Sequence, residues 1–318
     1  MKKKRWMCLA GFTLVVATVF GQTKAQNFKS EIPPPTHAEV VYGPHPRNVM
    51  DLWLAPSEEP TPLFVNMHGG GFRNGDKSIV SGDLIKDLNQ AGISVASINY
   101  RFKEDGKSRF EGENPLYPAI LLDGARALQF LRYHSARYNL DKTRFAAGGG
   151  SAGGQMSMWL GFHPDLAQAD HKDPVLRESS RLQVVAPWLG QTSIHGPTLL
   201  KWFGVKSLIR RLPDGTMKSS SEVEPPTDQE LALSLDASPI THLTPDDPPI
   251  YLYYNRRNVP VDEKTGQGIW VHHPIMGIKL KEAMDELGME CYLEYTDGPQ
   301  VTEYESLEKF IIRKLKSL

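Results

Sequence analysis

A glycine-rich turn around one serine constrains this chain more than any other feature. Residues 149–154 read Gly-Gly-Ser-Ala-Gly-Gly, between a short apolar segment at 144–147 and a second apolar segment that begins after Ser151. A sharp turn from a strand into a helix strains the central residue, so small neighbours are needed two positions before and after it. The turn lifts the serine oxygen out of the sheet, to a helix N-terminus that favours negative charge. The pattern predicts that Ser151 is a nucleophile.

Other glycine-rich turns fit the sequence less well. A phosphate-binding loop of the Walker type would end in Gly-Lys followed by Ser or Thr, and this turn has no lysine. A dinucleotide-binding turn would open the first strand–helix unit, whereas this turn lies near the middle of the chain. An inert glycine turn remains possible on this motif alone.

A second glycine cluster supports the nucleophile. Residues 68–72 read His-Gly-Gly-Gly-Phe and directly follow an apolar run at 63–67. Acyl transfer places negative charge on a carbonyl oxygen, which backbone amides can stabilise. We expect the amides of Gly70 and Gly71 to form such an oxyanion hole with the amide of Ala152. We expect His68 to brace this loop rather than to act as a base.

Hydrophobic periodicity predicts an α/β fold with a mostly parallel central sheet flanked by helices. The expected strands lie at 49–54 (an edge strand), 63–67, 93–100, 144–147, 182–189, 250–254 and 291–295. The expected helices lie at 78–91, 118–134, after Ser151, 274–287 and 303–315. Residues 191–235 interrupt this alternation, and we interpret them as a partial cap over the C-terminal edge of the sheet or as a surface excursion. The prediction is one domain over 49–318, preceded by an extended lead-in at 26–48.

The N-terminus has the composition of a targeting segment. Four basic residues at 2–5 precede an almost wholly apolar run that ends at Gly21. This pattern predicts a secretory signal peptide over residues 1–25, and therefore a secreted or periplasmic protein. The alternative is an uncleaved anchor, although the run is short for a bilayer span.

Removal of residues 1–25 would change the charge of the chain. Lys and Arg would fall from 36 to 31 against 37 Asp and Glu, so the net charge would move from −1 to −6. We therefore expect neither nucleic acid nor a membrane surface as a partner. Cys291 would be the remaining cysteine, expected in a buried strand. No two histidines are spaced as His-x-x-x-His, so we expect no metal.

Several motifs together resemble the α/β-hydrolase superfamily. The resemblance is strongest to secreted carboxylesterases related to hormone-sensitive lipase and to bacterial feruloyl and acetylxylan esterases. It is carried by the segments 51–56, 68–72, 99–101, 117–119 with Asp123, 149–154 and 238–250. The resemblance implies hydrolysis of a small-molecule or oligosaccharide ester through an acyl-serine intermediate, without a cofactor. It also implies a triad in the chain order serine, acid, histidine.

The second half of that triad departs from the pattern. The acid should follow the strand at 250–254 in a short turn, but a loop of about sixteen residues stands there, with Asp262 and Glu263 as possible acids. The histidine should follow the last strand, yet no histidine occurs after His273. A serine without an adjacent base is a poor nucleophile near neutral pH.

Three hypotheses remain open. In the first, His272 or His273 supplies the base and is held by Asp262, Glu263 or Asp297. In the second, the base is His195 or His242. In the third, the base is absent and the protein is a pseudo-hydrolase that binds a ligand. A carbohydrate-binding or structural role would suit secretion and the tryptophans at 159, 188, 202 and 270, but it would not require the two glycine motifs.

Overall fold

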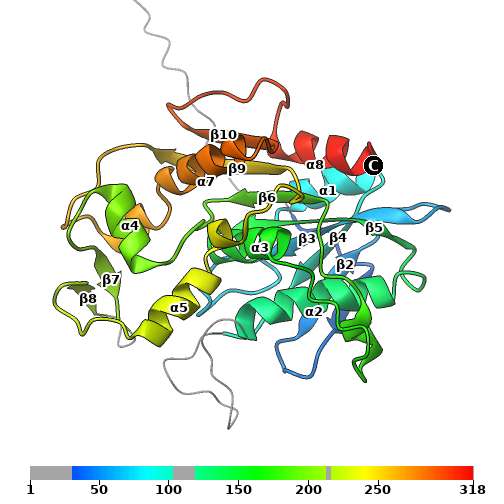
Figure 1. The fold of residues 1–318 in the computed structure, drawn as a ribbon. Coiled ribbons are helices and arrows are strands. Elements are labelled where there is room, and N and C mark those ends of the chain that lie inside the picture. Colours follow the sequence, from blue (N-terminus) through cyan, green and yellow to red (C-terminus); the bar gives the residue numbers. More distant parts are fainter. Residues whose placement is uncertain (1–30, 103–118, 213–215, 318) are drawn as a thin grey trace, which may run out of the picture.

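One mixed sheet of eight strands organises the part of the chain that the structure describes (Figure 1). The structure is a computed structural model and describes residues 31–102, 119–212 and 216–317. The predicted signal peptide lies outside these residues, as do positions 117 and 118 of the motif at 117–119. Within them, no helix is both long and apolar enough to cross a membrane.

The sheet has the strand order β1-β2-β4-β3-β5-β6-β9-β10. Its members are β1 (His37–Val41), β2 (Val49–Trp53), β3 (Thr61–Met67), β4 (Ser94–Ile98), β5 (Leu140–Gly150), β6 (Val184–Trp188), β9 (Ile250–Arg257) and β10 (Cys291–Thr296). The strands β4, β3, β5, β6, β9 and β10, in that order across the sheet, run parallel to one another. At one side, β2 pairs antiparallel with β4, and β1 pairs antiparallel with β2. All seven residues of β3 are buried, as expected for a central strand covered on both faces. The predicted parallel sheet is confirmed, and Cys291 is buried in β10.

The prediction of an edge strand at 49–54 is wrong. β2 forms there, but β1 pairs with its outer side and takes the edge. β1 lies inside the segment that was expected to be an extended lead-in. None of its residues is fully buried, and it lacks the continuous apolar run that marks the central strands.

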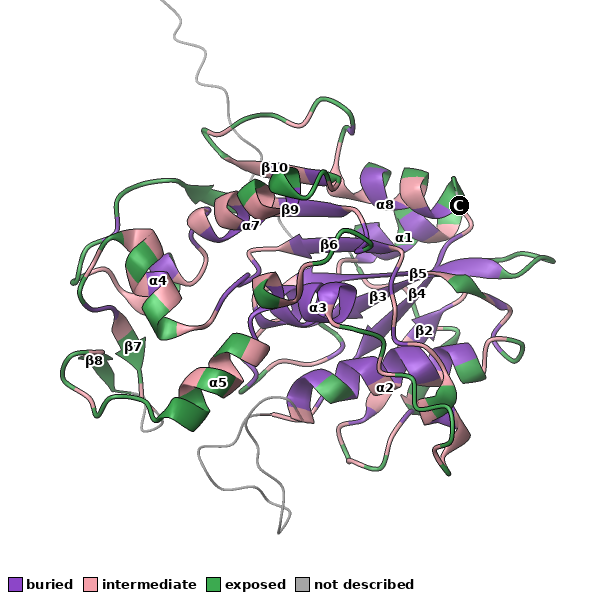
Figure 2. Ribbon diagram, in the orientation of Figure 1, coloured by how far each residue is buried: buried purple, intermediate pink, exposed green. Residues whose placement is uncertain are grey.

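Helices cover both faces of the sheet (Figures 1 and 2). One apolar core joins α2 (Ala119–Tyr133), α3 (Ala152–Phe162) and α7 (Ile275–Glu286) to the sheet. A second core joins α1 (Gly82–Gln90) and α8 (Leu307–Lys316) to the opposite face. The predicted helices are therefore present. α1 begins four residues later than expected, because the side chain of Ser81 caps it by accepting a hydrogen bond from the amide of Leu84.

The segment 191–235 forms an excursion beyond the C-terminal ends of the parallel strands (Figure 1). It contains α4 (Gly196–Phe203), the hairpin of β7 (Ile209–Arg211) and β8 (Met217–Ser219), and α5 (Asp228–Asp236), which extends one residue further. The 3₁₀ turns are η1 (Pro174–Arg177) and η2 (Pro239–His242), and the short helix α6 (Gln267–Trp270) precedes α7. The indole of Trp270 donates to the carbonyl of Ile209 at 2.7 Å, so the excursion holds the loop that follows β9.

A buried ion pair ties the end of β4 to α2. The carboxylate of Asp123, with 3% of its side chain exposed, lies 2.9 Å from Nε of Arg101. It also accepts from the Arg101 backbone amide and from Nη2, each at 2.9 Å. Such a bidentate pair is geometrically specific, and loss of one partner leaves the other charge uncompensated.

We predict that Asp123→Asn lowers the free energy of unfolding by about 2 kcal/mol or more, because the bidentate contact with the Arg101 guanidinium loses its negative charge in a largely buried site. Urea denaturation followed by circular dichroism measures this. Asp87→Asn on the exposed face of α1 is the matched control, with an expected change below about 0.5 kcal/mol. Equal urea concentrations at the midpoint of unfolding for the two variants would contradict the stabilising role of the ion pair.

Candidate active site

Ser151 sits at the turn between β5 and α3 in a strained backbone conformation. Its φ of 53° and ψ of −117° are unusual for a residue with a side chain. Two hydrogen bonds hold it there: its amide donates to the carbonyl of Trp188 at 2.9 Å, and its own carbonyl accepts from the amide of Gln155 at 2.9 Å. This is the strained turn that the glycine pattern predicts.

The glycines around Ser151 are required by close backbone contacts. A Cβ on Gly153 would lie 1.9 Å from the carbonyl oxygen of Met67, and one on Gly149 would lie 2.0 Å from the same atom. Gly149 also has a positive φ of 158°. Both positions therefore exclude any side chain while β3 stays beside the turn.

His272 lies against the serine. Its Nε2 is 2.8 Å from Oγ of Ser151, and its Nδ1 is 3.2 Å from the carbonyl oxygen of Gly268. Because a carbonyl only accepts hydrogen bonds, Nδ1 carries the proton and Nε2 presents its lone pair to the serine hydroxyl. This is the tautomer that a general base for Ser151 requires.

The surroundings of His272 keep the imidazole neutral. Burial lowers its pKa below the usual value, the hydrogen bond to Gly268 opposes this, and the charge of Arg256 lowers the pKa further. A neutral imidazole is the form that accepts a proton, so His272 is in its basic form near neutral pH.

The predicted acids do not reach this histidine. Asp262 is exposed, and its carboxylate accepts from Oγ1 of Thr265 and the amide of Lys264 within its own turn. Glu263 accepts from the amide of Lys206 at 3.3 Å. Asp297, exposed at the end of β10, pairs with Arg257 at 2.8 Å. The expectation that one of the three orients the base is therefore not met: the partner of Nδ1 is the Gly268 carbonyl.

The other candidate histidines are engaged elsewhere. His273 is buried, with Nε2 donating to the carbonyl of Val259 at 2.8 Å and Nδ1 accepting from the amide of Ile275 at 3.1 Å. Nδ1 of His195 contacts Oγ1 of Thr198 at 2.8 Å. His242 contacts the backbone carbonyl of Asp236. Among the four candidate histidines, all of them described by the structure, the contact with Ser151 is made by His272.

The loop 68–72 lies beside the nucleophile. A Cβ on Gly69 would be 3.5 Å from Cβ of Ser151, and Gly70 and Gly71 have positive φ values of 113° and 62°. Within the described residues, the amides of Gly70, Gly71 and Ala152 donate to no protein acceptor. These amides have room for an additional acceptor, and their role as an oxyanion hole stays a prediction.

His68 braces this loop. Its carbonyl accepts from the Tyr100 hydroxyl at 2.6 Å, its ring stacks on Tyr100 with centroids 4.2 Å apart, and its Nδ1 bonds to the Gly69 carbonyl at 2.7 Å. Burial lowers the pKa of His68 to about 4, so the imidazole is neutral. The contacts agree with the predicted bracing role.

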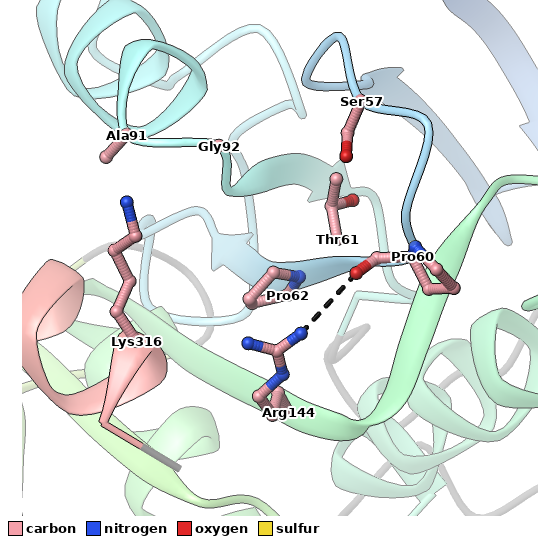
Figure 3. A pocket seen from close by; sticks show the side chains of 8 residues that line it. All are labelled: Ser57, Pro60, Thr61, Pro62, Ala91, Gly92, Arg144 and Lys316. Carbon is pink, nitrogen blue, oxygen red and sulfur yellow. Dashed lines mark hydrogen bonds between the residues drawn. The ribbon is translucent and has the colours of Figure 1, made fainter.

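A shallow pocket at the opposite end of the sheet takes no part in this site (Figure 3). It is lined by Ser57, Pro60, Thr61, Pro62, Ala91, Gly92, Arg144 and Lys316. Arg144, which donates to the carbonyl of Pro60 at 3.4 Å, stands near the beginning of β5, whereas Ser151 follows its end.

Residues 50–267 match the model of the BD-FAE family. The chain belongs to this family. Among curated relatives, it is 27% identical over 248 residues to "Probable carboxylic ester hydrolase LipM" of Mycobacterium tuberculosis, covering 72% of this chain and 50% of the relative. "Esterase LipQ" of the same organism is 23% identical over 230 residues, covering 70% of this chain and 48% of the relative. The chain thus spans about half the length of these relatives.

Solved structures show the same fold. The acetyl ester-xyloside bifunctional hydrolase from Caldicellulosiruptor lactoaceticus superposes with a TM-score of 0.59 at 21% identity, covering 85% of this chain and 87% of that one. A carbohydrate esterase from gut microbiota gives a TM-score of 0.61 at 17% identity, covering 88% and 96%. This family member therefore has the α/β-hydrolase fold.

We predict that Gly153→Ala abolishes esterase activity and destabilises the protein, because its Cβ would collide with the Met67 carbonyl. Gly196→Ala is the control: a Cβ there would meet no atom within 4 Å. Thermal denaturation and an ester-hydrolysis assay of both variants test this. A Gly153→Ala variant as stable and active as Gly196→Ala would show that the turn tolerates a side chain.

Proposed function

We propose that this member of the BD-FAE family is a serine carboxylesterase in which Ser151 and His272 form the catalytic pair. The observation that carries the proposal is the 2.8 Å contact between Oγ of Ser151 and Nε2 of His272, in the tautomer fixed by Gly268. The curated relatives named as a carboxylic ester hydrolase and an esterase support the reaction type.

The first half of the reaction forms an acyl-enzyme. His272 Nε2 takes the hydroxyl proton as Oγ of Ser151 attacks the ester carbon, and the carbonyl electron pair moves onto its oxygen. The amides of Gly70, Gly71 and Ala152 stabilise that oxygen. The intermediate then collapses, the imidazolium gives its proton to the departing alcohol, and the acyl group remains on Ser151.

The second half uses the same groups. His272 deprotonates a water molecule that attacks the acyl carbon, and the oxyanion again forms beside the loop 68–72. Collapse of this intermediate breaks the bond to Oγ of Ser151, releases the acid and returns the proton to the serine. The steps balance with one water molecule consumed for each ester bond hydrolysed.

The Gly268 carbonyl replaces the usual carboxylate in only one of its two functions. It fixes the imidazole tautomer, but as a neutral dipole it stabilises the imidazolium less than a carboxylate does. We therefore expect turnover below that of an enzyme with a complete triad. The deficit should be smaller than the ~10⁴-fold loss seen when a triad loses both the carboxylate charge and the correct tautomer.

An acylated carbohydrate is the substrate class that we propose. Two structural neighbours are described as an acetyl ester-xyloside hydrolase and a carbohydrate esterase. The indole of Trp188 lies next to the turn, since a Cβ on Gly150 would be 2.4 Å from its Nε1, and this side chain is only half-buried. An aromatic surface next to the nucleophile suits a sugar ring, and the predicted signal peptide suits a secreted or periplasmic enzyme.

The alternative is a pseudo-hydrolase that binds a ligand without turnover. The observation that favoured a pseudo-hydrolase was that no histidine follows the last strand in the sequence. The contact between Ser151 and His272 counts against it, because a base is present from a different loop.

We predict that Ser151→Ala and His272→Ala each lower kcat on acetylated xylo-oligosaccharides and on nitrophenyl acetate by about 10³-fold or more, since the pair acts as a unit. His195→Ala, on the excursion, should retain wild-type kcat. A fluorophosphonate probe should label the wild type and His195→Ala but not Ser151→Ala. Wild-type turnover no higher than that of Ser151→Ala would support the pseudo-hydrolase instead.

We also predict the pH dependence of kcat/KM. His272 must be neutral to accept a proton and its pKa is lowered, so activity should fall only as the pH drops through an apparent pKa below 6.5. Arg256→Gln should move this limb to higher pH, because a positive charge that disfavours the imidazolium is removed. Arg210→Gln, in the hairpin of the excursion, is the control. An acid limb centred above 6.5 in the wild type would contradict His272 as described.

A further inference from the structure

Three metal-binding side chains meet at the end of α3 that is remote from Ser151. His163 caps the C-terminus of α3, Asp236 is the last residue of α5, and His242 is the last residue of η2. One ligand atom from each lies within 4.8 Å of the other two. The two imidazole centroids are 4.8 Å apart. The sequence predicted no metal, but the fold joins histidines that are distant in the chain.

Both imidazoles are prepared to act as ligands. His163 donates from Nδ1 to the carbonyl of Pro164 at 2.9 Å, and His242 donates from Nε2 to the carbonyl of Asp236 at 2.5 Å. A carbonyl only accepts, so the second nitrogen of each ring carries a free lone pair. Metal-ligating histidines typically use their other nitrogen in this way.

The cluster is close to the size of a metal site. Ligands at about 2.0–2.1 Å from a tetrahedral ion lie about 3.4 Å apart, so the three atoms, which lie within 4.8 Å of one another, must close by at most about 1.4 Å. Trp159 supports them from behind: its buried ring packs on His163 at 4.2 Å, and its Nε1 donates to the Asp236 carbonyl at 2.8 Å. Because the backbone is held, rotation of the Asp236 carboxylate and the two rings supplies the closure.

We propose that His163, Asp236 and His242 bind one divalent transition-metal ion of the Zn²⁺ type, with water as the fourth ligand. Two imidazoles and one carboxylate favour Zn²⁺, Co²⁺ or Ni²⁺ over Mg²⁺ and Ca²⁺, which prefer oxygen ligands alone. The eleven residues of α3 span about 16 Å, so the ion would lie far from Ser151. Its role would be structural: it joins α5 of the excursion to the helix that begins at the nucleophile.

The test uses the untagged full chain after treatment with EDTA. Isothermal titration with ZnCl₂ should show one ion per chain with a Kd in the micromolar range or tighter. Co²⁺ should give the visible absorption typical of tetrahedral coordination, whereas MgCl₂ should give no heat. At Zn²⁺ concentrations 100-fold above Kd, the unfolding equilibrium constant should fall about 100-fold, seen as a rise in Tm.

Three variants separate this site from adventitious binding. Asp236→Asn removes the charge but keeps the backbone carbonyl and the side-chain volume, and His163→Gln and His242→Ala each remove one imidazole. Each should lower Zn²⁺ affinity at least tenfold and abolish the rise in Tm, while His195→Ala should behave as the wild type. Absence of stoichiometric binding, or equal Zn²⁺ affinity in all variants, would overturn the proposal whatever the esterase assay shows.

Discussion

The positive φ of Ser151 is the constraint on which the rest of the site depends. Such a conformation costs on the order of 1–3 kcal/mol and persists only where its surroundings enforce it. Here the enforcement comes from the Trp188 carbonyl at the end of β6 and from the Met67 carbonyl of β3, which leaves no space beside Gly149 and Gly153. The three central strands therefore converge on one residue. These contacts fix the position of the serine oxygen and of the start of α3.

The proposed base, His272, reaches this serine by an unusual path. In the usual arrangement of the fold, the end of β9 would carry an acid and the end of β10 a histidine. Here the end of β9 carries Arg256 and Arg257, and Asp297 after β10 pairs with Arg257. The histidine instead comes from the turn after α6, oriented by a carbonyl of that same helix. In the proposed mechanism the base is thus still oriented, by the Gly268 carbonyl, but the negative charge that usually stabilises the imidazolium is absent from this contact.

The features that could be predicted from the sequence are those that follow from a local pattern of residues. Apolar runs identified the central strands, and glycine spacing identified the turn and the oxyanion loop, because both follow from backbone geometry. The edge strand β1 was missed because none of its residues is fully buried and it lacks a continuous apolar run. The choice between His272 and His273 needed the path of the loop, since adjacent residues point in different directions. The orienting group had no side-chain signature, because it is the carbonyl of Gly268.

The link between the excursion and the loop after β9 has a consequence for redesign of this protein. Trp270 bonds to Ile209, and Gln267 accepts from the amide of Arg211 at 2.7 Å, so the excursion is attached to the helix that orients His272. Exchange of this segment with that of a relative would therefore also shift the position of His272. A chimaera in which His272 keeps its position should therefore transfer residues 191–236 and 258–273 together.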